Sequence, residues 1–194
     1  MMGQKRWGKE NAVAETGIAE DTAGMTTLSV KEYFAASFEY DREWVGGTVV
    51  ERNGGEFDHS FLQALVGAHF HNRRAKWDVV CLSSVRVQTG PTRIRVPDLT
   101  ILRAGTPRER ILTHPPLLVI EIQSPEDTLR RTRDKAAEYL AFGIEHVWII
   151  DPTARVGYRG TATGLELARS GELAIPESPI RIVLAEMFAE LDRV

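Results

Sequence analysis

The chain has little of what marks secreted or membrane proteins. Of its 194 residues only one is cysteine, Cys81, so an internal disulfide is excluded and a reducing, cytoplasmic setting is favoured. Its wholly aliphatic runs, such as residues 117–120, are far shorter than the roughly 20 residues of a membrane-spanning helix. No apolar stretch of signal-peptide length follows the basic residues near the N-terminus. We therefore expect a cytoplasmic protein with no membrane partner.

Two common catalytic motifs are absent as well. Without a G-x-S-x-G segment there is no nucleophile elbow, and without G-x-x-x-x-G-K-[ST] there is no phosphate-binding loop of that type. The chain also lacks a basic excess, with 24 Lys+Arg against 27 Asp+Glu and a net charge of −3. Total charge therefore gives no indication of a nucleic-acid partner.

The charge is distributed unevenly. Residues 91–135 contain nine Lys/Arg and six Asp/Glu, a local balance of +3, while the rest contains fifteen against twenty-one, or −6. A basic cluster of this kind is most often a solvated surface. The charge of this segment alone therefore does not indicate a function.

Length and composition predict one α/β domain behind a short extension. Residues 1–26 are rich in Gly, Ala, Glu and Thr without an apolar period, which is typical of a flexible extension. Translation could start at Met25 instead of Met1, and the sequence does not decide between the two. Residues 27–194 are expected to form the domain, a central mixed β-sheet flanked by helices.

Local signals predict the elements of this domain. A capping box at Ser29–Glu32 begins a short helix, and Gly46–Gly47 joins a hairpin. Apolar residues at helical spacing indicate two longer helices and a last one that begins near residue 184. The two longer helices are expected at 58–77 and 126–142, and strands at 79–88, 93–102, 117–123, 145–151, 155–159 and 165–169.

Two carboxylates occupy positions where a carboxylate is costly. Glu121 lies inside the apolar strand 117–123, and Asp98 lies in the strand 93–102. Each alone is best explained as a strand-end acid paired with arginine or a backbone amide. If the two strands are neighbours, strand alternation brings the carboxylates together, and with a backbone carbonyl they form an oxygen site suited to Mg²⁺ or Mn²⁺. Lys135 could supply a further cation there, although its spacing alone favours a solvated lysine.

Three segments carry a resemblance to a known family. PDLTIL (97–102), PPLLVIEIQSP (115–125) and KAAEYLAFGIEHVWIIDP (135–152) resemble the Uma-type family of restriction endonucleases, in the PD-(D/E)XK superfamily. The likeness extends over about residues 27–151. It implies a restriction-endonuclease-like fold and a metal-dependent endonuclease that hydrolyses phosphodiester bonds of DNA. It also implies that Asp98 and Glu121 ligate Mg²⁺ or Mn²⁺ and that Lys135 orients or activates water.

The chain departs from the expected pattern at three positions, one of which is Thr48 after Gly47, where the hairpin commonly has glutamate. The superfamily's lysine lies two residues after the second acid, where this chain has Gln123, and in the Uma-type family a helix lysine corresponding to Lys135 replaces it. An acid expected one turn before that lysine is Arg131 here. The departures keep an alternative open, a catalytically silent nuclease-fold module that binds nucleic acid or a protein partner.

Further residues complete the expected site. His59 begins the long helix, and two explanations stay open: a metal-shell or proton-transfer group, or a polar contact at the helix N-terminus. Either Glu51 or Glu56 could complete the metal shell. Members of the superfamily are often dimers, so the resemblance also allows a homodimer. Three arginines on one helix are expected to contact DNA backbone phosphates: Arg130, Arg131 and Arg133.

Overall fold

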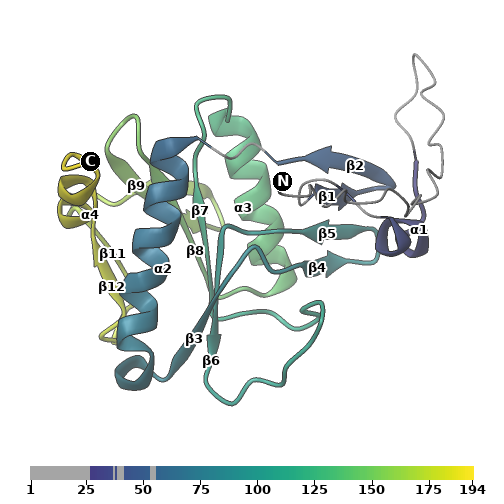
Figure 1. Ribbon diagram of the computed structural model, residues 1–194, viewed down its shortest axis with the longest axis horizontal. Helices are drawn as coiled ribbons and strands as arrows, with labels where there is room; N and C mark the ends of the chain where they lie inside the picture. Colours follow the sequence, from purple (N-terminus) through teal and green to yellow (C-terminus); the bar gives the residue numbers. More distant parts are fainter. Residues whose placement is uncertain (1–26, 37, 39–41, 53–55) are drawn as a thin grey trace, which may run out of the picture.

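The computed structural model describes residues 27–36, 38, 42–52 and 56–194, and the extension predicted over 1–26 lies outside them. These residues form four helices and twelve strands (Figure 1). None of these helices is long and apolar enough to cross a membrane. The helices are α1 (Val30–Ala35), α2 (Phe57–Trp77), α3 (Leu129–Phe142) and α4 (Leu184–Leu191). The strands are β1 (Arg42–Val45), β2 (Thr48–Glu51), β3 (Val79–Ser83), β4 (Val87–Gly90), β5 (Arg93–Arg95), β6 (Leu99–Arg103), β7 (Leu118–Ile122), β8 (His146–Asp151), β9 (Val156–Thr161), β10 (Gly164–Leu167), β11 (Glu172–Ala174) and β12 (Arg181–Val183).

A six-stranded sheet forms the centre of the molecule, in the order β10-β9-β8-β7-β6-β3. Only β7 and β8 pair in parallel, because α3 connects them, and the other neighbours are antiparallel. Helices α2 and α4 pack on one face of this sheet and α3 on the other (Figure 1). The predicted α/β fold with a central mixed sheet flanked by helices is therefore confirmed.

Strand β7 is apolar on both faces because helices cover both. Leu118 and Ile120 belong to the core under α2 and α4, whereas Val119 packs on the opposite face with Tyr139 of α3. Glu121 follows Val119 at strand spacing, so it also faces α3. A carboxylate is thereby placed under a helix, where it needs partners.

A second, four-stranded sheet stands beside the first, in the order β2-β1-β5-β4 (Figure 1). The predicted hairpin joins β1 to β2, and Gly46 and Gly47 take the positive φ angles of 60° and 93° that its tight turn requires. Helix α1 begins with the predicted capping box. Its Tyr33 packs with Trp44 of β1 and Ile94 of β5 on this small sheet.

Two of the expected strands were wrong as single elements. Residues 79–88 form β3 and β4, and residues 93–102 fall in β5 and β6, so each segment leaves one sheet and enters the other. Pro97 lacks the N–H that a continuous ladder needs, and Ser84 turns the chain with a φ of 50°. As a result Asp98 lies where the chain passes from the small sheet into the central one.

Helix α3 begins three residues later than expected. The side chain of Thr128 accepts a hydrogen bond from the backbone N–H of Arg131 at 3.2 Å and caps the helix there. Gly143 ends it with a φ of 103°, as the sequence predicts. The short β11–β12 hairpin has no expected counterpart, because its three-residue strands carry too little alternation to be recognised.

Candidate functional site

Asp98, directly before β6, and Glu121 of β7 come together where these two strands pair antiparallel. Leu99 of β6 faces Ile120 of β7, so one residue further along the register Asp98 lies opposite Glu121. The backbone N–H of Ile122 donates to Oδ2 of Asp98 at 2.8 Å, which joins the two strand ends. The convergence expected from strand alternation is therefore present in the structure.

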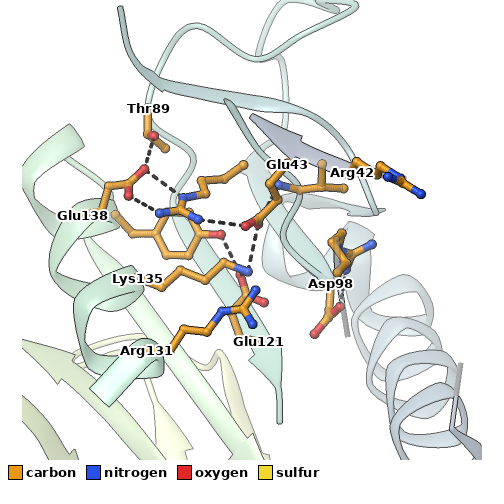
Figure 2. A network of polar contacts seen from close by, with 12 residues as sticks. Arg42, Glu43, Thr89, Asp98, Glu121, Arg131, Lys135 and Glu138 are labelled. Atoms are coloured by element: carbon orange, nitrogen blue, oxygen red, sulfur yellow. Dashed lines mark hydrogen bonds and ion pairs between the residues drawn. The ribbon is translucent and has the colours of Figure 1, made fainter. Parts of the chain in front are cut away.

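Lys135 reaches Glu121 from helix α3. Its Nζ lies 3.0 Å from Oε1 of Glu121 and 3.0 Å from Oε1 of Glu43 on β1, so the ammonium sits between two carboxylates (Figure 2). Tyr139, one turn along α3, donates its hydroxyl to the same Oε1 of Glu121 at 2.6 Å. Tyr139 is buried, as expected of a core aromatic, but it also orients the acid.

Glu43 is a site residue that the sequence reasoning missed. It is only 2% exposed, and besides Lys135 it accepts from Nη1 of Arg95 at 2.8 Å and from the backbone N–H of Val96 at 3.2 Å. Arg95 in turn pairs with Glu138 of α3 at 2.5 Å. Figure 2 shows these groups as one continuous network. No pattern in the sequence distinguishes Glu43 from exposed hairpin acids.

Both oxygens of Asp98 have partners. Nη2 of Arg52 donates to Oδ1 at 2.5 Å, and Nε2 of His59 lies 3.2 Å from Oδ2. His59 is buried in the first turn of α2 and contacts Asp98 from there, a position that fits both of the roles expected for it. Gln63 of the same helix donates to the Asp98 carbonyl at 3.0 Å.

The charges of these groups follow from burial and pairing. Burial opposes ionisation of Asp98, yet the hydrogen bond from His59 and the charges of His59 and Arg52 keep its pKa below the ordinary value. Burial raises the pKa of Glu121, and Lys135 only partly offsets the rise. For Lys135 the charged neighbours outweigh burial. Burial lowers its pKa, but Glu121 and Glu43 together raise it above the ordinary value.

A small cavity of about 50 Å³ connects these side chains. A buried water needs roughly 10–15 Å³ of such volume, so the cavity has room for a few waters or a partly hydrated ion. The side-chain oxygen of Gln123, Oε1, is buried and has no hydrogen-bond partner among the described residues. The lining residues are Glu43, Arg52, Asp98, Glu121, Ile122, Gln123, Asp127, Arg131, Thr132, Lys135, Ala136, Tyr139, Val147 and Ile149.

The donor set for a metal is sparse. Within the described residues no group of three or more His, Cys, Asp or Glu side chains is arranged to hold an ion. Lys135 and Tyr139 both contact Oε1 of Glu121. Among the described residues, Oε2 has no hydrogen-bond or ion-pair partner. Mg²⁺ is usually bound by one or two carboxylates and keeps several waters. Asp98 and Glu121 fit such an ion, in a cavity with room for its waters.

Comparison with known proteins identifies the family. The model of the Uma2 family, described as "Putative restriction endonuclease", matches residues 31–163. The chain belongs to the Uma2 family. The match contains all four residues just described: Glu43, Asp98, Glu121 and Lys135. No curated protein matches the chain.

One solved structure shares the fold of this chain over most of its length. A crystal structure described as "a putative nuclease belonging to DUF820 from Anabaena variabilis ATCC 29413" superposes with a TM-score of 0.73 and 18% identity, over 84% of this chain and 99% of that one. At this identity the likeness shows the fold alone. A DrdV–DNA complex matches with a TM-score of 0.41 and 14% identity, over 72% of this chain and 11% of that one, too little to support an argument.

The remaining expected residues of this Uma2 protein divide into two groups. Arg131 lines the cavity, and its Nη2 lies 3.4 Å from the carbonyl of Glu51. Arg130 and Arg133 are exposed on α3 and do not line the cavity. Neither Glu51 nor Glu56 lines it either, so the upstream acid at this site is Glu43.

Proposed function

We propose that this Uma2 protein is a divalent-metal-dependent endonuclease that hydrolyses phosphodiester bonds of DNA. The observation that carries the proposal is the convergence of Asp98, Glu121 and Lys135 on one cavity in a chain of this family. A carboxylate pair beside a buried ammonium is costly to fold, and a structural role alone would be served as well by apolar residues.

Each side chain has a defined task in the proposal. Oδ1 of Asp98 and Oε2 of Glu121 would hold Mg²⁺ or Mn²⁺, which when bound neutralises charge on the phosphate and acidifies a bound water. Tyr139 fixes Glu121 by occupying Oε1. His59 and the Ile122 N–H fix Asp98 by occupying Oδ2. The acids are thus held in place before a substrate arrives.

Lys135 supplies the fixed positive charge. Two of its three N–H groups face Glu43 and Glu121, and the third is available to a water or a phosphate oxygen in the cavity. In hydrolysis the water oxygen bonds to phosphorus, one P–O bond to the sugar breaks, and the departing oxygen takes up a proton. Negative charge accumulates on the phosphate during that exchange, and Lys135 lies beside the cavity where it would develop.

DNA would approach along helix α3. Arg131 lines the cavity, while Arg130 and Arg133 are exposed on the same helix and would contact phosphates outside it. Contacts of arginine with backbone phosphates position a protein on DNA without reading sequence. The homodimer that the resemblance allows stays a prediction, which size-exclusion chromatography with light scattering tests.

A second candidate function is a catalytically silent module that binds nucleic acid or a protein partner. Gln123 favours it, because a neutral amide stands where the superfamily's lysine would lie, and so does Arg131 in the place of an expected acid. In that case the cavity would hold no metal and the acids would only balance the lysine and arginines.

Thermal unfolding with metal separates the two candidates. Mg²⁺ or Mn²⁺ at 100 times its Kd should stabilise the wild type by about 2.7 kcal/mol. Asp98→Asn and Glu121→Gln should lose this gain, whereas Glu145→Gln, an exposed acid outside the cavity, should keep it. Plasmid nicking with Mn²⁺ should follow the same pattern and should also be lost in Lys135→Met. A wild type that is neither stabilised nor active, yet retains DNA, would establish the silent module.

A further inference from the structure

The two oxygens of Asp98 are used in different ways. Oδ2 receives the backbone N–H of Ile122 at 2.8 Å and Nε2 of His59 at 3.2 Å, and both donors belong to regular elements of the fold. Oδ1 has a single partner among the described residues, Nη2 of Arg52 at 2.5 Å. Since Oδ2 is saturated, Oδ1 is the oxygen of Asp98 open to a metal ion. Arg52 occupies that oxygen.

Arg52 is held mainly by this one contact. It follows the end of β2, its side chain is 17% exposed, and it lines the cavity. Its other partner among the described residues is the hydroxyl of Ser84, at 3.4 Å from Nη1, which is long for a hydrogen bond. The guanidinium is therefore partly open to solvent and anchored by Asp98, unlike Lys135, which two carboxylates hold.

The charge balance of the cavity shows what a bound ion would change. Lys135 lies between Glu43 and Glu121, while Arg52 neutralises Asp98. A divalent cation on Oδ1 would meet the guanidinium at contact distance, and two like charges repel strongly in a buried cavity. A metal ion and Arg52 therefore compete for that oxygen, and binding of one weakens the binding of the other.

We propose that Arg52 is a substrate-binding residue stored on the metal position of Asp98. The incoming cation displaces it, and the released guanidinium then binds a phosphate of the nucleic-acid backbone. Guanidinium groups pair with phosphate oxygens in the bidentate geometry that they use with carboxylates, so the same group fits both partners. Phosphate binding by Arg52 is thereby coupled to occupation of the metal site. This inference rests on the proposed function, because it takes Asp98 as a metal ligand.

Calorimetric titration of metal-free protein with Mn²⁺ tests the exchange. Arg52→Gln keeps a polar side chain but removes the competing charge, so it should bind Mn²⁺ about tenfold more tightly than wild type, the equivalent of one lost charge-assisted hydrogen bond. Arg131→Gln is the matched control, since Arg131 also lines the cavity but makes no contact with Asp98, and it should stay within about threefold of wild type. Circular dichroism confirms that each variant is folded.

Salt dependence of DNA binding tests the second half of the inference. Affinity for one short duplex is measured against salt concentration with Ca²⁺, an ion that also takes oxygen ligands, and with EDTA. One phosphate contact contributes about 0.9 to the slope of log K against log[salt]. Arg52→Gln should therefore reduce the slope by about 1 with Ca²⁺ and leave it unchanged with EDTA. Arg131→Gln should reduce it under both conditions.

The outcomes distinguish this inference from the proposed function. The role of Arg52 would be overturned if wild type and Arg52→Gln bound Mn²⁺ equally. It would also be overturned if Arg52→Gln changed the salt slope of DNA binding equally with Ca²⁺ and with EDTA. Either result would leave the metal site standing. Failure of both proteins to bind Mn²⁺ would overturn the metal site itself and the exchange with it. Tighter Mn²⁺ binding by Arg52→Gln than by wild type would support the role of Arg52. Loss of that binding in the double variant Arg52→Gln/Asp98→Asn would support the metal site as well.

Discussion

Replacing Glu43 by glutamine should lower the free energy of unfolding by about 3 kcal/mol at pH 7. Glu43 is 2% exposed and accepts from Arg95 Nη1, Lys135 Nζ and the Val96 N–H at 2.8, 3.0 and 3.2 Å. Glutamine has nearly the same shape but no charge, and its NH2 group would place donors against one of the two cations, Lys135 or Arg95. Each cation keeps a second acid, so the loss should lie at the lower end of the roughly 3–5 kcal/mol for a broken buried pair.

The pKa of Glu43 gives the same magnitude by a second route. Burial alone would raise it, but Lys135 and Arg95 bring it down from 4.5 to about 2. A difference of about 2.5 pKa units at roughly 1.4 kcal/mol each favours the charged carboxylate in the folded state by about 3 kcal/mol.

The loss should also depend on pH in a defined direction. Because the pKa of Glu43 is lower in the folded than in the unfolded state, its charge stabilises fully above pH 4.5, and the contribution disappears as pH falls towards 2. The difference between wild type and Glu43→Gln should therefore shrink from about 3 kcal/mol at pH 7 to about 2 kcal/mol at pH 3.5.

Urea unfolding followed by tryptophan fluorescence measures both values, with an unchanged m-value showing that the same surface is exposed. Glu145→Gln is the control: Glu145 pairs with Arg103 at 3.0 Å with 55% of its side chain exposed, so its removal should cost less than about 1 kcal/mol. A loss for Glu43→Gln no larger than that of the control, or a loss that stays constant between pH 7 and 3.5, would refute the reasoning.

Three further predictions address other parts of the molecule. Tyr139→Phe removes the 2.6 Å hydrogen bond to Glu121, so it should cost about 1–2 kcal/mol in urea unfolding and reduce Mn²⁺-dependent nicking; unchanged stability would contradict it. Gly157→Ala would place a Cβ 2.9 Å from Cδ1 of Leu184, so overpacking should cost about 1–3 kcal/mol and lower the melting temperature; an unchanged Tm would contradict it. Burial raises the pKa of the Cys81 thiol to about 11, so a thiol reagent at pH 8 should react much faster in urea than with folded protein; equal rates would contradict it.

The parallel pair at the centre of the sheet, β7 and β8, could be predicted because these strands and their connection carry their own signals. Residues 117–123 are apolar on both faces, which marks a strand covered on both sides, and the helix between β7 and β8 requires a parallel pair. The convergence of Asp98 with Glu121 follows from alternation once β6 and β7 are neighbours. These inferences use only periodicity and connection length, which the sequence carries directly.

The division of the chain between two sheets could not be predicted in the same way. The segments 79–88 and 93–102 each have a continuous β pattern, and a strand that leaves one sheet for another keeps its alternation. Pro97 was a usable signal, since proline interrupts a ladder. Ser84 was not, because a positive φ at serine is set by the surrounding structure rather than by the residue type.

The partners of Asp98 and Lys135 could not be predicted, for a different reason. Arg52 contacts Asp98 from 46 positions earlier in the chain, across the boundary between the two sheets. Glu43 reaches Lys135 across the same boundary. Pairings of this kind depend on how two separate sheets are packed, and no local propensity encodes that packing.

The β1–β2 hairpin therefore has a larger part in the site than its sequence indicates. From β1 it places the carboxylate of Glu43 against Lys135, and directly after β2 it places the guanidinium of Arg52 against Asp98. Glu43 and Arg52 are opposite in charge, so together they add no net charge to the cavity. They nevertheless supply the charge partners of Lys135 and Asp98. A displacement of the hairpin would loosen Lys135 and uncover Asp98 together. Variants that disturb its turn should accordingly bind Mn²⁺ more tightly but nick plasmid more slowly, even though no residue of the turn lines the cavity.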